Sequence, residues 1–176
     1  GKVEIAHEPV AVTLAGGETA TLERPRYRVT DLAYGPIHAQ VALSPRVAPP
    51  MIGMGLLELI PEADIVARAD PEDRDGDGIR GIAQRAWSEA KQRAMLGRFG
   101  WKATQPTVDD QIAAAFSGDM GLSTPIRTAS AGDCTQAQAA CLAAPDGADA
   151  REGVEVTRTM FDLVRLYAHN LAVPAR

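Results

Sequence analysis

Three aspartates within five residues, in the segment Asp73-Arg74-Asp75-Gly76-Asp77-Gly78-Ile79, constrain the fold of this 176-residue chain more than any other feature. Carboxylates at alternate positions direct their oxygens toward a common centre, and a glycine at the sixth position permits the sharp turn that such a loop needs. A hard divalent cation takes six to eight such oxygens. The segment therefore predicts a calcium-type loop rather than a regular helix or strand.

The predicted metal ligands are the side chains of Asp73, Asp75 and Asp77 and the backbone carbonyl of Ile79. Gln84 stands at the twelfth position of the loop, where calcium-binding loops usually carry an acid. A side-chain carbonyl or a water would fill that place. We therefore expect looser calcium binding than in a regulatory loop.

The alternative interpretation of the loop is a solvated acidic turn, because Asp and Gly are favoured in turns. Three aspartates so close together repel one another unless something neutralises them, which favours calcium over the bare turn. Magnesium fits less well, since it avoids dense all-protein cages. Asp70 is a candidate outer ligand. No nucleophile or proton donor stands beside the loop, so we expect a structural metal rather than a hydrolytic one.

The rest of the chain predicts an α+β fold: an N-terminal β-hairpin or small antiparallel sheet, followed by several α-helices and long loops. Val10, Val12 and Leu14 alternate with small or polar residues, a turn follows at 15–18, and the alternation resumes at Ala20 and Leu22. Pro25 must then lie at a sheet edge or at a strand end.

The predicted helices differ in the strength of their signals. Residues 51–60 place Ile52, Leu56, Leu59 and Ile60 on one helical face, and Pro61 can open a second short helix. Residues 83–96 are rich in helix-favouring side chains, although their apolar spacing is poor.

Two further helices carry N-terminal caps. Thr107, with Asp110 three residues on, resembles a capping box before a helix that ends at Gly118. Thr157 caps the last helix, whose apolar stripe is Met160, Phe161, Val164, Tyr167 and Leu171.

This pattern indicates a single domain or fragment. Its parts are a β-hairpin region at 1–33, helices with the Asp-rich metal loop at 45–120, a loop-rich region with a cysteine pair at 121–153, and a C-terminal helix at 157–172. The chain opens Gly1-Lys2-Val3, with no initiator Met and no signal sequence, so we expect a mature fragment or subregion of a longer protein.

The composition excludes several functions. A net charge of −5 with scattered basic residues argues against nucleic acid. No apolar run approaches the ~20 residues of a membrane helix. His7, His38 and His169 form no ligand pair, and no serine or glycine-rich loop marks a hydrolase or nucleotide site.

Cys134 and Cys141 are the two cysteines of the chain. On one straight helix, seven residues of rise would separate them by about 10.5 Å, too far for a disulfide. They can pair only if Cys134 lies in a loop that folds back onto the helix, and two buried free thiols fit the spacing equally well.

Several segments in order resemble the di-haem oxidoreductase family of peroxidases, some of which are named thiol oxidoreductases. The quoted segments are 44–58 (Ser44-Pro45-Arg46 to Leu57-Glu58), Ala69-Asp70-Pro71 with the Asp-Gly loop, 96–103 (Leu96-Gly97-Arg98-Phe99-Gly100-Trp101-Lys102-Ala103), 116–121 and 167–176. The resemblance runs from about residue 34 onward. It implies a c-type cytochrome oxidoreductase with electron transfer through two haems.

The family carries two C-x-x-C-H haem-attachment motifs, one upstream and one downstream of the matched region, and this sequence contains neither. The resemblance therefore implies an inter-haem segment that is not an enzyme by itself and whose partners are the flanking haem domains of the parent chain. Related di-haem peroxidases relay electrons through a tryptophan, a role that Trp101 would take, and Met120 would be an axial haem ligand. Without the resemblance, both residues are ordinary packing or surface side chains.

The family's haems are attached outside the cytoplasm. The resemblance therefore implies a periplasmic or otherwise extracytoplasmic location, where calcium is available and a Cys134–Cys141 disulfide is favoured. The competing hypothesis is a non-enzymatic, calcium-stabilised extracytoplasmic binding module, which the acidic loop and the predicted fold suit equally well.

Overall fold

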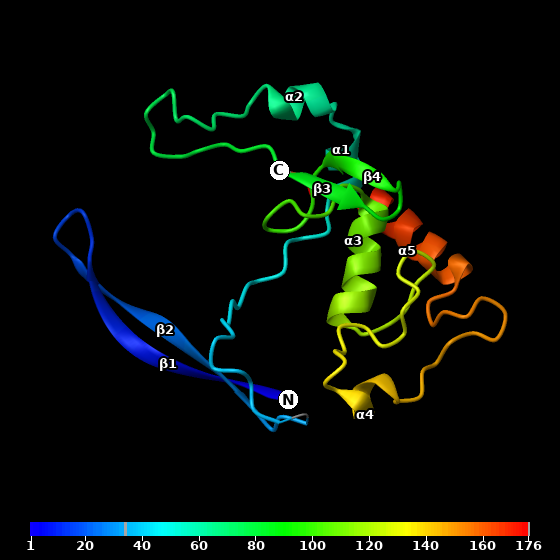
Figure 1. Ribbon diagram of the computed structural model, residues 1–176. Helices are drawn as coiled ribbons and strands as arrows, with labels where there is room; N and C mark the ends of the chain where they lie inside the picture. Colours follow the sequence, from blue (N-terminus) through cyan, green and yellow to red (C-terminus); the bar gives the residue numbers. More distant parts are fainter. Residues whose placement is uncertain (34, 176) are drawn as a thin grey trace. The chain divides into compact units, whose positions relative to one another are not determined.

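The computed structural model describes residues 1–33 and 35–175. These residues form two compact units, Gly1–Ala48 and Pro49–Arg176, each of which is described here by itself. Together they have the predicted α+β character: an antiparallel two-stranded sheet at the N-terminus, then short helices and loops (Figure 1). None of the helices in the described part of the chain has the length and apolar character needed to cross a membrane.

The first unit is the predicted hairpin. Strands β1 (Lys2–Thr13) and β2 (Thr19–Thr30) pair antiparallel, from Lys2 opposite Thr30 to Thr13 opposite Thr19. The turn closes where Gly17, at φ 83°, donates its N–H to the carbonyl of Leu14 at 2.9 Å. Pro25 lies opposite His7 inside β2, and in a two-stranded sheet such a position belongs to an edge strand.

The second unit contains the remaining elements. In chain order they are α1 (Met54–Leu59), α2 (Glu62–Val66), β3 (Arg85–Ser88), β4 (Arg93–Leu96), α3 (Val108–Ala114), the π-helical turn η1 (Ala115–Asp119), α4 (Ala139–Leu142) and α5 (Arg158–Asn170). Helices α1, α3 and α5 pack against one another and form the centre of the unit (Figure 1). The core cluster includes Met54, Val108, Ile112 and Phe161 from these helices, together with Phe99 from the segment between β4 and α3.

Close contact between α1 and α5 depends on Gly55. A Cβ atom at this position would collide with the carbonyl oxygen of His169 in α5. The neighbouring Gly53, at φ 73°, donates its N–H to the carbonyl of Leu171 at 2.9 Å. The two glycines that lower helix propensity in this segment are therefore the residues that let α1 approach α5.

Both predicted helix caps are present. Thr107 Oγ1 accepts the N–H of Asp110 at 3.0 Å, and Thr157 Oγ1 accepts the N–H of Met160 at 3.4 Å. Helix α3 ends at Ala114, and the helical path continues as η1, with a wider π-type turn, past the predicted end at Gly118 to Asp119. Such turns often occur at functional sites.

The predicted helix over 83–96 is wrong: these residues form the β3–β4 hairpin, with Arg85 opposite Leu96 and Ser88 opposite Arg93. Two side-chain acceptors, rather than backbone carbonyls of the turn, hold the turn between the strands. The Ala90 N–H donates to Asp110 Oδ1 at 2.9 Å, and the Lys91 N–H donates to Ser88 Oγ at 3.0 Å. The tertiary bond from Asp110 and the local bond from Ser88 together outweigh the helix propensity of the segment.

The predicted apolar faces of two helices need correction. In α1 the buried residues are Met54 and Gly55, whereas Leu56 and Leu59, on the predicted face, are exposed. In α5 the buried residues are Phe161 and Ala168, with Val164 and Leu171 half-buried, but Met160 and Tyr167 are exposed. Each helix thus buries a small residue outside the predicted apolar set, Gly55 in α1 and Ala168 in α5, while Phe161 is buried as predicted.

Candidate functional site

The acidic loop brings the three aspartates together. Carboxylate oxygens of Asp73, Asp75 and Asp77 all lie within 4.8 Å of one another, so that they can hold a metal ion. Backbone amides fix the carboxylates: the Gly78 N–H donates to Asp73 at 3.2 Å and the Ile79 N–H donates to Asp77 Oδ1 at 2.7 Å. Asp73, Gly76 and Gly78 adopt positive φ angles, which turn the chain around this centre.

The ends of the loop are joined by a β-bridge. Asp70 and Gly81 exchange backbone hydrogen bonds of 2.8 and 3.1 Å. Asp70 Oδ2 accepts the Arg74 N–H at 2.8 Å, whereas its Oδ1 is buried and has no hydrogen-bond partner among the described residues. Gln84 lies just before β3, and its carbonyl accepts the N–H of Gly97 at 2.9 Å.

A second feature is an apolar pocket of about 510 Å³ in the second unit. Its walls come from α1 with the segment before it, the 98–101 turn, the α3–η1 helix and α5. The lining is mostly apolar, and its thioether and aromatic side chains are Met51, Met54, Met120, Phe99, Trp101 and Phe116. A mostly apolar cavity with few polar groups is typical of a cofactor or small-molecule site.

The pocket unites Trp101 and Met120, which are 19 positions apart in the sequence. Met120 follows η1 directly, and its N–H donates to the carbonyl of Ala115 at 3.3 Å. Trp101 is 64% exposed and Met120 62% exposed, although both are large and apolar. Exposed apolar side chains gathered around one cavity indicate a surface that receives another group.

Sequence reasoning missed the polar members of this pocket, Arg98 and Gln111. Gln111 Oε1 is buried and has no hydrogen-bond partner in the described part of the chain. Arg98 lies in segment 96–103, which resembles the family, but the resemblance did not predict a role for Arg98 itself. Only the fold brings Gln111 from α3 to the same cavity.

A separate, polar pocket of about 400 Å³ contains the one histidine that lies near other charged groups in the second unit. His169 Nε2 lies 3.4 Å from Glu58 Oε2, and Glu58 Oε1 accepts the Val108 N–H at 2.8 Å. Arg165 contacts Asp162 and Asp109 in the same pocket. Charged side chains of α1, α3 and α5 therefore interact with one another in this pocket. Among the described residues, no histidine belongs to a cluster that could hold a metal ion.

Glu155 anchors the segment that follows Met120. Its carboxylate accepts the Ser123 N–H at 2.8 Å and the Gly147 N–H at 3.2 Å. These backbone hydrogen bonds, the Ser123 bond first, lower the pKa of Glu155 below its usual value. The charged form therefore persists to lower pH in the folded chain, and the stability it contributes is lost only as the pH falls through that lowered pKa.

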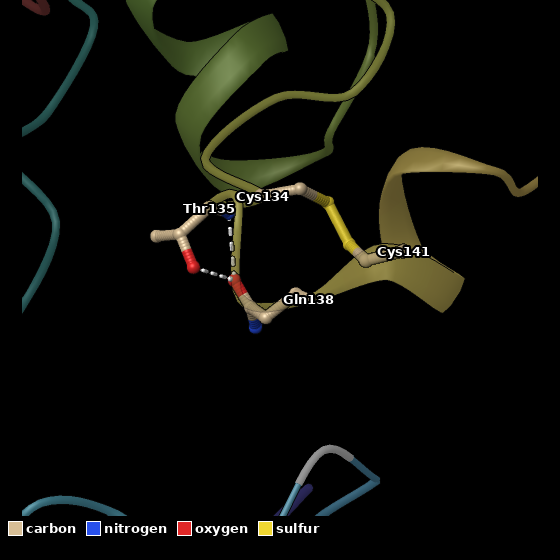
Figure 2. Close-up of a disulfide and its surroundings, with 4 residues drawn as sticks. All are labelled: Cys134, Thr135, Gln138 and Cys141. Atoms are coloured by element: carbon tan, nitrogen blue, oxygen red, sulfur yellow. Dashed lines mark hydrogen bonds between the residues drawn. A yellow bond between two sulfur atoms is a disulfide. The ribbon is translucent and has the colours of Figure 1, made fainter.

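Cys134 and Cys141 form a disulfide with a Cα–Cα distance of 6.0 Å (Figure 2). Cys134 lies in the turn before α4 and Cys141 lies within α4, so the pair bridges the loop and the helix as their spacing requires. Gln138 Oε1 accepts both the N–H and the hydroxyl of Thr135, at 2.8 and 3.1 Å, and this closes the same turn (Figure 2). A disulfide fits a protein outside the cytoplasm.

Comparison with known proteins identifies the family of the chain. Residues 2–176 match the protein-family model described as "Di-haem oxidoreductase, putative peroxidase". No curated protein and no solved structure gives a significant match. Because the family match covers nearly the whole chain, this protein belongs to the di-haem oxidoreductase family.

Proposed function

We propose that this chain is the inter-haem segment of an extracytoplasmic, peroxidase-like c-type cytochrome, and that its apolar pocket lies against a haem of the parent protein. The observation that carries the proposal is the meeting of Trp101 and Met120 in one apolar cavity. When bound, a haem supplies one-electron redox chemistry, and the protein tunes it through axial ligands, polarity and burial. The flanking haem domains of the parent chain would be its partners.

The residues of the pocket fit a haem in their chemistry. A porphyrin ring presents two large apolar faces, and the thioether and aromatic side chains of the pocket suit such a surface. Met120 would supply a thioether to the iron, and Trp101 would lie near the ring as an electron relay. The buried Gln111 Oε1 lacks a partner among the described residues and would accept a hydrogen bond from a water or polar group that enters with the ligand.

The pocket can be tested with haemin and the two tryptophans of the chain. We expect haemin to bind saturably and W101A to weaken this binding more than W87A, because Trp101 lines the pocket and Trp87, in β3, does not. Soret absorbance titrations of the wild-type chain, W101A and W87A measure this, with W87A as the matched control. Equal affinities of W101A and W87A, or no saturable binding, would contradict the placement of a haem in this pocket.

We also propose that the acidic loop binds calcium as a structural ion. The three aspartates would supply the side-chain oxygens, with the Ile79 carbonyl and Gln84 as further ligands. The buried, unpartnered Asp70 Oδ1 supports a cation or ordered water beside the loop. The same ion would serve the rival function, a calcium-stabilised binding module, which the haemin titration distinguishes from the haem-facing segment.

Calcium should raise the melting temperature of the chain. If it binds only the folded loop, calcium at a hundred times its Kd stabilises the fold by about 2.7 kcal/mol, whereas magnesium should have a smaller effect. Melting curves in calcium, magnesium and chelator measure this. The D75N/D77N variant should lose the response, and Glu72→Gln, which removes a neighbouring exposed acid outside the triad, should keep it. A melting temperature that calcium leaves unchanged would refute the site.

A further inference from the structure

Arg98 is the positively charged residue of the apolar pocket. Among the described residues its side chain is held at one nitrogen: Nη1 donates to the carbonyls of Leu57 at 3.0 Å and Ile60 at 2.7 Å, at the C-terminal end of α1. These bonds use both hydrogens of Nη1 and leave the three N–H groups of Nε and Nη2 for other acceptors. The guanidinium is thus positioned by the backbone and not by an acid.

The charge of Arg98 is not balanced by a carboxylate in the part of the chain that the structure describes. No Asp or Glu of the described residues forms an ion pair with Arg98, and the residue is half-buried. A half-buried guanidinium whose Nε and Nη2 hydrogens have no acceptor among the described residues can bind an anion that enters the pocket. The planar fork of a guanidinium matches a carboxylate in two parallel hydrogen bonds.

We propose that Arg98 is the carboxylate-recognition residue of the pocket, binding a propionate of the haem whose ring rests on the apolar wall. This inference rests on the proposed function and specifies which chemical group of the ligand the pocket recognises. The ligand class that suits the whole pocket is a flat, apolar ring system with a carboxylate at its edge. Haem has this chemistry, and its dimethyl ester has the same ring without the negative charges.

The test compares haemin with haemin dimethyl ester on the full chain, by Soret absorbance and Trp101 fluorescence. We expect R98Q to weaken haemin binding by roughly ten- to a hundredfold, the range for a lost hydrogen bond to a charged group, and to change ester binding less than about twofold. R98K should retain part of the affinity, because a point charge replaces the fork. Lys102→Gln is the matched control, since it removes an exposed positive charge outside the pocket lining.

Two other outcomes would overturn the inference in different ways. If R98Q weakens haemin and the ester equally, Arg98 acts only through its bonds to α1, and the pocket assignment stands without it. If the wild-type chain binds neither porphyrin, the haem-facing pocket itself is wrong. Circular dichroism melting of R98Q and R98K shows whether the fold, α1 included, survives the substitutions. If a variant binds the ester as tightly as the wild-type chain does, its pocket is intact.

Discussion

Replacing Phe161 by alanine is expected to destabilise the second unit by about 3 to 5 kcal/mol. Phe161 is fully buried in α5 and belongs to the central cluster with Met54, Val108 and Ile112. Truncation removes the aromatic ring from a close-packed interior that can collapse only partly around the space. Because small domains have only about 5 to 15 kcal/mol of stability, this loss should be visible at once in urea unfolding.

Leu163 provides the matched control for this substitution. It lies in the same helix two residues later, and it is 62% exposed. Leu163→Ala should therefore change the free energy of unfolding by less than about 0.5 kcal/mol. Similar losses for both variants would show that α5 does not bury the face that contains Phe161.

The second large effect is expected at Asp110, whose buried carboxylate joins α3 to the β3–β4 turn. Asp110 Oδ2 accepts the hydroxyls of Ser88 at 2.7 Å and Thr107 at 2.6 Å, and Oδ1 accepts the Ala90 N–H at 2.9 Å. Asp110→Ala leaves three donors without this acceptor, at a site where Asp110 itself is only 3% exposed. We expect a loss of roughly 2 to 4 kcal/mol in the free energy of unfolding.

Hydrogen exchange would locate the effect of this substitution. The Ala90 amide should lose its protection in the D110A variant, because its acceptor is gone. Asp119→Ala, which removes an exposed carboxylate at the end of η1, should leave both the stability and this amide unchanged. If the Ala90 amide stays protected in D110A, the turn is held by something other than Asp110.

The helix caps, the hairpin turn and the acidic loop were predictable because each depends on residues close in sequence. Thr107 and Thr157 bond to amides three residues on, and the Asp73–Asp77 carboxylates bond to amides of their own loop. The sequence also contained the family's segments, which pointed to Trp101 and Met120. The binding of a metal by the aspartates, the further metal ligands and the roles of both pocket residues stay predictions.

The faces of α1 and α5 and the β3–β4 hairpin were not predictable in this way. Helix α1 buries Gly55 because the α5 backbone passes too close for any side chain, and periodicity alone favours larger residues. The hairpin exists because Asp110 and Ser88 satisfy its turn, although residues 83–96 have the composition of a helix.

By itself, the sequence determined the α+β class with its N-terminal hairpin, the acidic loop, the caps and the family, because these follow from short-range chemistry and from motifs in order. Only the tertiary structure decided that residues from α1, the 98–101 turn, α3–η1 and α5 surround one apolar pocket. It also decided that Arg98 enters that pocket held by two carbonyls and without an acidic partner in the described chain. Such a site depends on which backbones can approach one another, and that is set by long-range packing.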